Sequence, residues 1–211
     1  MVFRSLLAPI YFLLERSGGY AIGQWIGRPT IHRFRELFRE NIVMSHEERV
    51  LDLGCGIGGY RDCFAGQYHG IDINPDYIAD ARRRLDGTFE VMDCNELRFA
   101  EGSFHHVVSI ATTHHLSDEE LQRTLKEALR VCAPSGSVHV IDAVLPMTSG
   151  QYLKYLYFRA DRGRYPRYLE RLVEVAGAVC RIACVKTMTG PLHDVCYLRL
   201  TKQADERKLA A

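Results

Sequence analysis

The stretch Val50-Leu51-Asp52-Leu53-Gly54-Cys55-Gly56-Ile57-Gly58-Gly59-Tyr60 decides the fold class of this 211-residue chain. A short apolar run leads directly into a cluster of glycines, which predicts a buried strand followed by a tight turn. Glycines adopt positive φ angles and let the backbone come into contact with a ligand. We therefore interpret this stretch as the junction of a strand with a ligand-binding loop.

Short apolar runs and amphipathic stretches alternate along most of the chain. The runs predict strands at 50–53, 68–72, 89–92, 106–111 and 137–142, and the amphipathic stretches predict helices near 59–65, 75–85 and 118–132. Two later runs, 180–188 and 193–200, are joined by a Gly-Pro turn and predict an antiparallel pair at the sheet edge. The expected fold is α/β, with a doubly wound seven-stranded sheet that is mostly parallel and has an antiparallel last strand.

Three carboxylates follow the first three predicted strands. Asp52 lies at the end of the first, Asp72 ends the second and Asp93 follows the third. The carboxyl ends of parallel strands meet at one edge of the sheet, where ligands of open α/β sheets bind. Asp72 can bind two ribose hydroxyls, Asp93 can accept the amine of adenine, and Asp52 can attract an ammonium group through the loop.

The glycine loop fits two cofactor classes. Gly54, Gly56 and Gly59 match the G-x-G-x-x-G spacing of dinucleotide-binding domains, which predicts an NAD-dependent oxidoreductase. Asp52 opposes that interpretation, because a carboxylate next to the loop would repel a pyrophosphate, and Asp93 and the final strand pair also count against it. The acid-x-Gly-x-Gly-x-Gly pattern from Asp52 to Gly58 is instead similar to the loop of S-adenosylmethionine (SAM) methyltransferases.

The chain resembles the small-molecule branch of the class I SAM-dependent methyltransferase family. Besides the glycine loop, the resemblance rests on Gly70-Ile71-Asp72-Ile73-Asn74-Pro75, Phe99 to Phe104, His114-His115-Leu116, Ala133 to Ser137 and the final strand pair. His105 departs from the family, which usually has an Asp at that position. The resemblance implies that SAM is the cofactor and that it is bound by Asp52, Gly54, Cys55, Gly56, Asp72, Ile73, Asp93, Cys94 and Ser109.

Histidines are the candidate general bases for methyl transfer to a hydroxyl or an acidic carbon. His115 is the first candidate and His114 the second, because both follow the fourth strand beside the expected methyl donor. Each has an alternative role in shaping the pocket. No metal site is expected: neighbouring histidines on a strand face opposite sides of the sheet, and Thr112 and Thr113 stand where metal-assisted methyltransferases have carboxylates.

The chain is expected to divide into a helical N-terminal cap at 1–46, a cofactor-binding domain at 47–201 and a frayed tail at 202–211. Ser17-Gly18-Gly19 should end a first helix, and Pro29 should start a second. Residues 143–179 are interpreted as a lid that is rich in tyrosine and arginine. Tyr152, Tyr155, Arg159 and His193 are the candidate substrate contacts, for a hydrophobic or ring-bearing acceptor such as a lipid, a quinone or a natural product.

Composition narrows the partners and the compartment. With 27 basic and 26 acidic residues, bulk charge gives no indication of nucleic-acid binding. Seven cysteines without framework spacing favour a reducing, cytoplasmic location. The apolar face at Leu6–Leu14 and the basic residues of the cap and the lid are compatible with peripheral membrane contact. A catalytically silent SAM-binding partner protein remains an alternative, because methyl transfer requires few dedicated groups.

Overall fold

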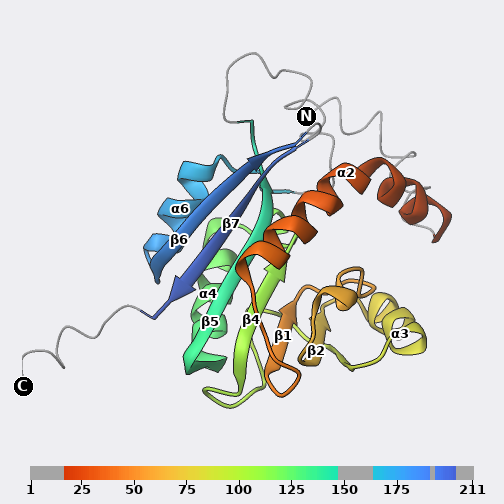
Figure 1. The fold of residues 1–211 in the computed structure, drawn as a ribbon, viewed down its shortest axis with the longest axis horizontal. Coiled ribbons are helices and arrows are strands. Elements are labelled where there is room, and N and C mark those ends of the chain that lie inside the picture. The colour runs from red at the N-terminus through yellow and green to blue at the C-terminus, as the bar shows by residue number, and fades with distance from the viewer. Residues whose placement is uncertain (1–16, 147–163, 191–192, 203–211) are drawn as a thin grey trace, which may run out of the picture.

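The computed structural model describes residues 17–146, 164–190 and 193–202. Its sheet has seven strands: β1 (Arg49–Leu53), β2 (Gln67–Asp72), β3 (Thr88–Val91), β4 (Phe104–Ile110), β5 (Cys132–Val144), β6 (Arg181–Thr189) and β7 (Asp194–Thr201). The order across the sheet is β3-β2-β1-β4-β5-β7-β6, and β7 runs antiparallel to both of its neighbours (Figure 1). The seven-stranded α/β sheet with an antiparallel last strand is therefore confirmed.

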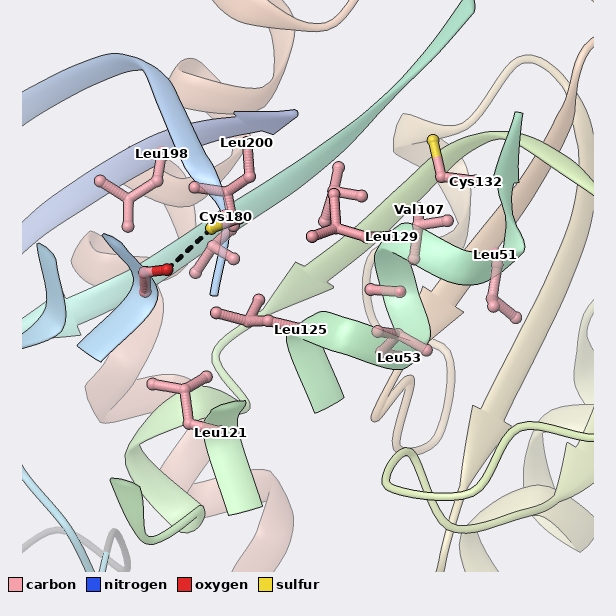
Figure 2. Close-up of a cluster of buried hydrophobic side chains, with 14 of the residues drawn as sticks. Leu51, Leu53, Val107, Leu121, Leu125, Leu129, Cys132, Cys180, Leu198 and Leu200 are labelled. Atoms are coloured by element: carbon pink, nitrogen blue, oxygen red, sulfur yellow. Dashed lines mark hydrogen bonds between the residues drawn. The ribbon is translucent and has the colours of Figure 1, made fainter. Parts of the chain in front are cut away.

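Helices cover both faces of the sheet. They are α2 (Ser17–Asn41), α3 (Pro75–Arg84), α4 (Asp118–Val131) and α6 (Leu169–Gly177). Figure 2 shows one core, in which Leu121, Leu125 and Leu129 of α4 lie among side chains from β1, β4 and β7. In the same view the thiol of Cys180, just after α6, donates a hydrogen bond to the backbone oxygen of Ala176.

The opposite core lies between the sheet and the helices α2 and α3. Phe34, Leu37 and Phe38 of α2 pack there with Tyr197 of β7 and with Ile78 of α3. Each core therefore combines segments that are far apart in the sequence, and the doubly wound arrangement follows from the two apolar faces of a parallel sheet.

The start of α4 is capped by side chains. The Ser117 hydroxyl accepts a hydrogen bond from the Glu120 amide, and the Glu120 carboxylate accepts one from the Ser117 amide. This reciprocal pair satisfies two amides that the first turn of a helix leaves without partners. It also sets the end of the loop that connects β4 to α4.

One predicted helix boundary is wrong. α2 (Ser17–Asn41) continues through Pro29, where the sequence predicted a helix start; the first helix, with an end predicted at Ser17-Gly18-Gly19, lies outside the described residues. Packing of Phe34, Leu37 and Phe38 against the sheet outweighs the local cost of proline.

The predicted helix at 59–65 is only a short 3₁₀ turn, η1 (Arg61–Cys63), because Gly58 has a φ of +78° and glycine disfavours helix.

Part of the predicted cap and lid lies outside the described residues. This applies to the first helix, to residues 147–163 of the lid, and so to Tyr152, Tyr155 and Arg159. The domain boundaries at 46 and 202 stay predictions. None of the helices that the structure describes is long and apolar enough to cross a bilayer.

Candidate active site

The glycine loop is held to the neighbouring strand by its own backbone. The amides of Gly54 and Cys55 both donate to the backbone oxygen of Ile71, at 2.9 and 2.8 Å. The next amide, that of Gly56, donates to the Oδ2 atom of Asp72 at 2.9 Å. The loop therefore turns over the end of β2 and brings its glycines next to the Asp72 carboxylate.

Two glycines in this loop have different reasons to be glycine. Gly54 has a φ of +73°, and a Cβ atom there would lie 2.5 Å from the side chain of Thr112. Gly56 has a φ of +56°, but a Cβ atom there would have no neighbour within 4 Å. Gly54 thus allows the loop to pack against the chain after β4, whereas Gly56 faces open space that a ligand can occupy.

The ends of β2 and β3 present two fixed carboxylates. Asp72 accepts a second hydrogen bond from the Asn74 amide at 2.8 Å, and Asp93 accepts from the amide and the side chain of Asn95. Between them in sequence stands Ile73, which is apolar and yet 70% exposed. Because β2 pairs with β3 in parallel, the two acids lie at adjacent strand ends.

These residues fit an adenosine group. A carboxylate held by two amides accepts ribose hydroxyls without rearranging, and the exposed isoleucine offers an apolar surface for a ring. Cys94 is half-buried and accepts a hydrogen bond from the hydroxyl of Thr124. Its place beside Asp93 agrees with the predicted adenine pocket, whereas Ser109 is buried within β4.

Asp52 lies behind the loop. Its carboxyl group is buried and accepts a hydrogen bond from the Tyr68 hydroxyl at 2.8 Å. Burial raises the pKa of Asp52 to about 7, although the bond from Tyr68 opposes that change. Asp52 therefore supports the site from behind, and any effect of its carboxyl group on a ligand passes through the loop.

The loop after β4 is strained and closely held. Ala111 has a φ of +56°, which is uncommon for any residue except glycine. The Thr112 hydroxyl next to it lies 3.1 Å from the backbone oxygens of both Leu53 and Ile110. This contact joins the β4 loop to the glycine loop, and a short 3₁₀ turn, η2 (Thr113–His115), follows.

His114 is paired with a buried carboxylate. Its Nδ1 atom lies 2.6 Å from Oδ1 of Asp142, and its amide donates to Oδ2 at 3.1 Å. The hydroxyl of Thr113 and the amide of Ala143 also donate to the same carboxylate. Burial opposes the charge, but His114 and these hydrogen bonds hold the pKa of Asp142 below its usual value.

This pairing determines the chemistry available to His114. An ionised carboxylate only accepts, so Nδ1 carries the proton and Nε2 is the basic nitrogen of the neutral ring. A histidine oriented in this way by a carboxylate is suited to act as a general base.

The other predicted histidines are placed differently. His115 is exposed, and its ring centroid lies 4.2 Å from that of His114. His193 is buried against α2, where its Nδ1 atom lies 2.8 Å from the Thr30 hydroxyl. The structure thus brings His114 and His115 together and places His193 at the contact between α2 and the end of the sheet.

Sequence reasoning missed two residues of this site. Asp142 lies two residues before the end of β5 and is the last residue of the strand predicted at 137–142, so the rule that selected the acids after the first three strands would also have found it. Arg167 was read as part of a basic lid, but it is buried and bonded to the loop that carries His114. No local pattern indicates that partner. Among the described residues, no three metal-ligating side chains gather into a cluster.

The fold, together with the residues at the ends of β1 to β3, fits a domain that binds an adenosine-containing cofactor. Residues 50–136 match the methyltransferase domain family. An uncharacterized methyltransferase of Synechocystis is 29% identical over 65% of this chain and 64% of its own length. A 2-methyl-6-phytyl-1,4-hydroquinone methyltransferase of the same organism is 37% identical over 44% of this chain and 31% of its own length.

A solved structure agrees in fold. Phosphoethanolamine N-methyltransferase 2 of Haemonchus contortus, in complex with SAM, superposes with a TM-score of 0.69 at 20% identity, covering 90% of this chain and 59% of that one. The chain spans less than two thirds of the length of the two curated relatives named above. The domain match over residues 50–136 and the fold support a class I SAM-dependent methyltransferase.

Proposed function

We propose that this protein transfers the methyl group of SAM to a hydroxyl, or to the acidic carbon of a ring, in a small hydrophobic acceptor. The observation that carries this proposal is the pair formed by His114 and buried Asp142, next to a glycine loop with two anchored carboxylates. An acceptor that loses a proton needs a base, whereas a free amine needs none.

In this proposal, one set of residues binds the cofactor and another removes the proton of the acceptor. Asp72 and Asp93 hold the adenosine part, and Gly56 leaves room for the backbone to contact it. Bound SAM would supply an electrophilic methyl group. His114 takes the acceptor's proton at Nε2, and Asp142 stabilises the resulting imidazolium through Nδ1. Most of the rate enhancement comes from orientation of the two reactants, which contributes about 7–11 kcal/mol in favourable cases.

The surroundings of His114 favour a ring-bearing acceptor. Tyr165 is large and exposed, and its amide donates to the backbone oxygen of His114. Among the relatives, one is named for a phytylated hydroquinone and another, of Arabidopsis thaliana, for tocopherol. Others are named for phosphoethanolamine and for the alkaloid norajmaline, so relatedness alone leaves the acceptor open.

Transfer of labelled methyl groups tests the proposal. The protein is incubated with labelled SAM and four acceptors: a prenylated hydroquinone, a simple catechol, phosphoethanolamine and a secondary amine. We expect an O- or C-methylated product from one of the first two. Product from an amine alone, at a rate that His114→Gln leaves unchanged, would contradict it. So would calorimetric binding of NAD without binding of SAM.

A further inference from the structure

Arg167 makes an unusual set of contacts for a residue in an arginine-rich segment. Its guanidinium donates to the backbone oxygens of Thr113 at 2.9 Å and Leu116 at 2.6 Å. Nε donates to the Asp118 carboxylate at 2.7 Å, and the side chain is only 7% exposed. The guanidinium thus contacts the loop on both sides of His114 and His115, and also the first residue of α4.

The backbone around Arg167 adds two bonds to the same region. The Tyr165 amide donates to the oxygen of His114 at 2.9 Å, and the Leu145 amide donates to the oxygen of Arg167 at 2.8 Å. Leu145 directly follows β5, the strand that carries Asp142. The segment 165–167 is therefore bonded to both chain segments that provide the His114–Asp142 pair.

The loop needs this support because its own conformation is unfavourable. A non-glycine residue at positive φ, such as Ala111, is strained and persists only where neighbouring contacts impose it. Thr112 holds the start of the loop to β1, and Ser117 caps α4 at its end. Between these points, the backbone oxygens of Thr113, His114 and Leu116 are bound by Arg167 and Tyr165.

We infer that Arg167 is a positioning residue: it holds the β4–α4 loop so that the imidazole of His114 stays bonded to Asp142. This inference rests on the proposed role of His114 as the base. Arg167 acts through the loop backbone and not on the acceptor. Because its guanidinium is engaged in these bonds, Arg167 is unavailable for an anionic acceptor or a lipid headgroup.

The chain offers a matched control in Arg171. Its guanidinium also bonds to Asp118, but it is half exposed, pairs with Glu174 and makes no recorded contact with the β4–α4 loop among the described residues. Arg167→Lys and Arg171→Lys therefore remove the same chemical group next to the same carboxylate. Lysine keeps the charge but cannot reproduce the planar set of donors that reaches two carbonyl oxygens and a carboxylate.

Nuclear magnetic resonance of histidine-labelled protein, saturated with S-adenosylhomocysteine, tests the inference without knowledge of the acceptor. The wild type should show a slowly exchanging Nδ1–H signal and a protected amide from His114. In Arg167→Lys both should exchange at least tenfold faster, while Arg171→Lys retains them. Calorimetry should give the same S-adenosylhomocysteine affinity for all three proteins. A folded Arg167→Lys with unchanged His114 signals would overturn the inference.

A second variant covers the case in which Arg167→Lys does not fold. Asp118→Asn leaves the bonds from Arg167 to the two carbonyl oxygens but removes the carboxylate that orients it, so exchange at His114 should rise by a smaller factor. No change in that variant would count against the inference. Once an acceptor is known, Arg167→Lys should lower kcat roughly 10- to 100-fold with little change in the KM for SAM.

The two proposals fail in different ways. If His114→Gln leaves kcat unchanged while Arg167→Lys still loosens the loop, His114 is not the base and the catalytic part of this inference falls with it. If His114→Gln abolishes activity while Arg167→Lys leaves kcat and exchange unchanged, the base stands and the positioning role of Arg167 is refuted.

Discussion

The two halves of the site are built in different ways. At the ends of β2 and β3, the carboxylates of Asp72 and Asp93 are held by the amides of Asn74 and Asn95, each two residues further along the chain. At the ends of β4 and β5, His114 depends on Asp142, 28 residues away, and on Arg167, which lies beyond the end of β5. The first half is a local motif, and the second is a tertiary assembly.

This difference indicates which half is open to change. The cofactor half tolerates changes elsewhere in the fold, because its anchoring bonds lie within one strand end or, as between Gly56 and Asp72, between two adjacent strands. The catalytic half requires β5, the β4–α4 loop and the segment 165–167 to be in place together. Members of one family can therefore differ in their acceptors through changes in the catalytic half, while the cofactor half stays the same.

The largest effect should come from His114. We expect His114→Gln to lower kcat by roughly 10²–10⁴-fold and to remove the decline of rate at acidic pH, because a protonated ring cannot accept a proton. Steady-state kinetics across pH with the identified acceptor provide the measurement. His115→Gln is the matched control, since His115 is exposed and adjacent in sequence. A larger loss in His115→Gln would reverse the assignment and restore the order that the sequence predicted.

The next effect concerns the local half. Asp72→Ala should weaken binding of S-adenosylhomocysteine by about 1–3 kcal/mol, because it leaves ribose hydroxyls without an acceptor in the bound state. Isothermal calorimetry measures this, with the exposed Asp76→Ala as the control on the neighbouring helix start. Equal affinity in the two variants would show that the adenosine group binds elsewhere.

Asp52 should make the free energy of unfolding depend on pH. Its carboxyl pKa is about 7 in the folded protein against an ordinary value of 3.8, so only the folded state keeps the proton between these values. Its contribution to the free energy of unfolding therefore falls as pH rises through that range, by up to about 1.4 kcal/mol per pH unit. Asp52→Asn should flatten this part of a urea-denaturation series. An unaltered slope would mean that Asp52 is ionised in the folded protein.

The smallest expected effect is weak binding to membranes. We propose such contact for the N-terminal segment together with the basic residues of the lid. Each basic residue near an anionic surface contributes about 1 kcal/mol. Arg167 and Arg171 are engaged with Asp118, which lowers the charge available. Flotation with anionic vesicles at low salt should show weak, salt-sensitive binding, and neutral vesicles should show none. Absence of binding to anionic vesicles at low salt would exclude such contact.

The sequence by itself determined the sheet, the glycine loop and the cofactor half. Alternating apolar runs, glycine spacing and the acids after the first three strands are local patterns, and the bonds from Asn74 and Asn95 that hold two of these acids are local as well. It also identified two histidines after the fourth strand. It placed His115 before His114 and gave no sign that His114 pairs with a carboxylate, because that carboxylate belongs to another strand.

Tertiary structure alone decided the remaining features. The helix α2 runs through Pro29 because its apolar face packs on the sheet, although local propensity favours a break there. Arg167 looks like its basic neighbours in sequence, and only the fold places it beside the carbonyl oxygens of Thr113 and Leu116. Every residue has a backbone carbonyl, so the sequence does not indicate which carbonyl a distant side chain will bind. Such a contact can be identified only in the folded structure.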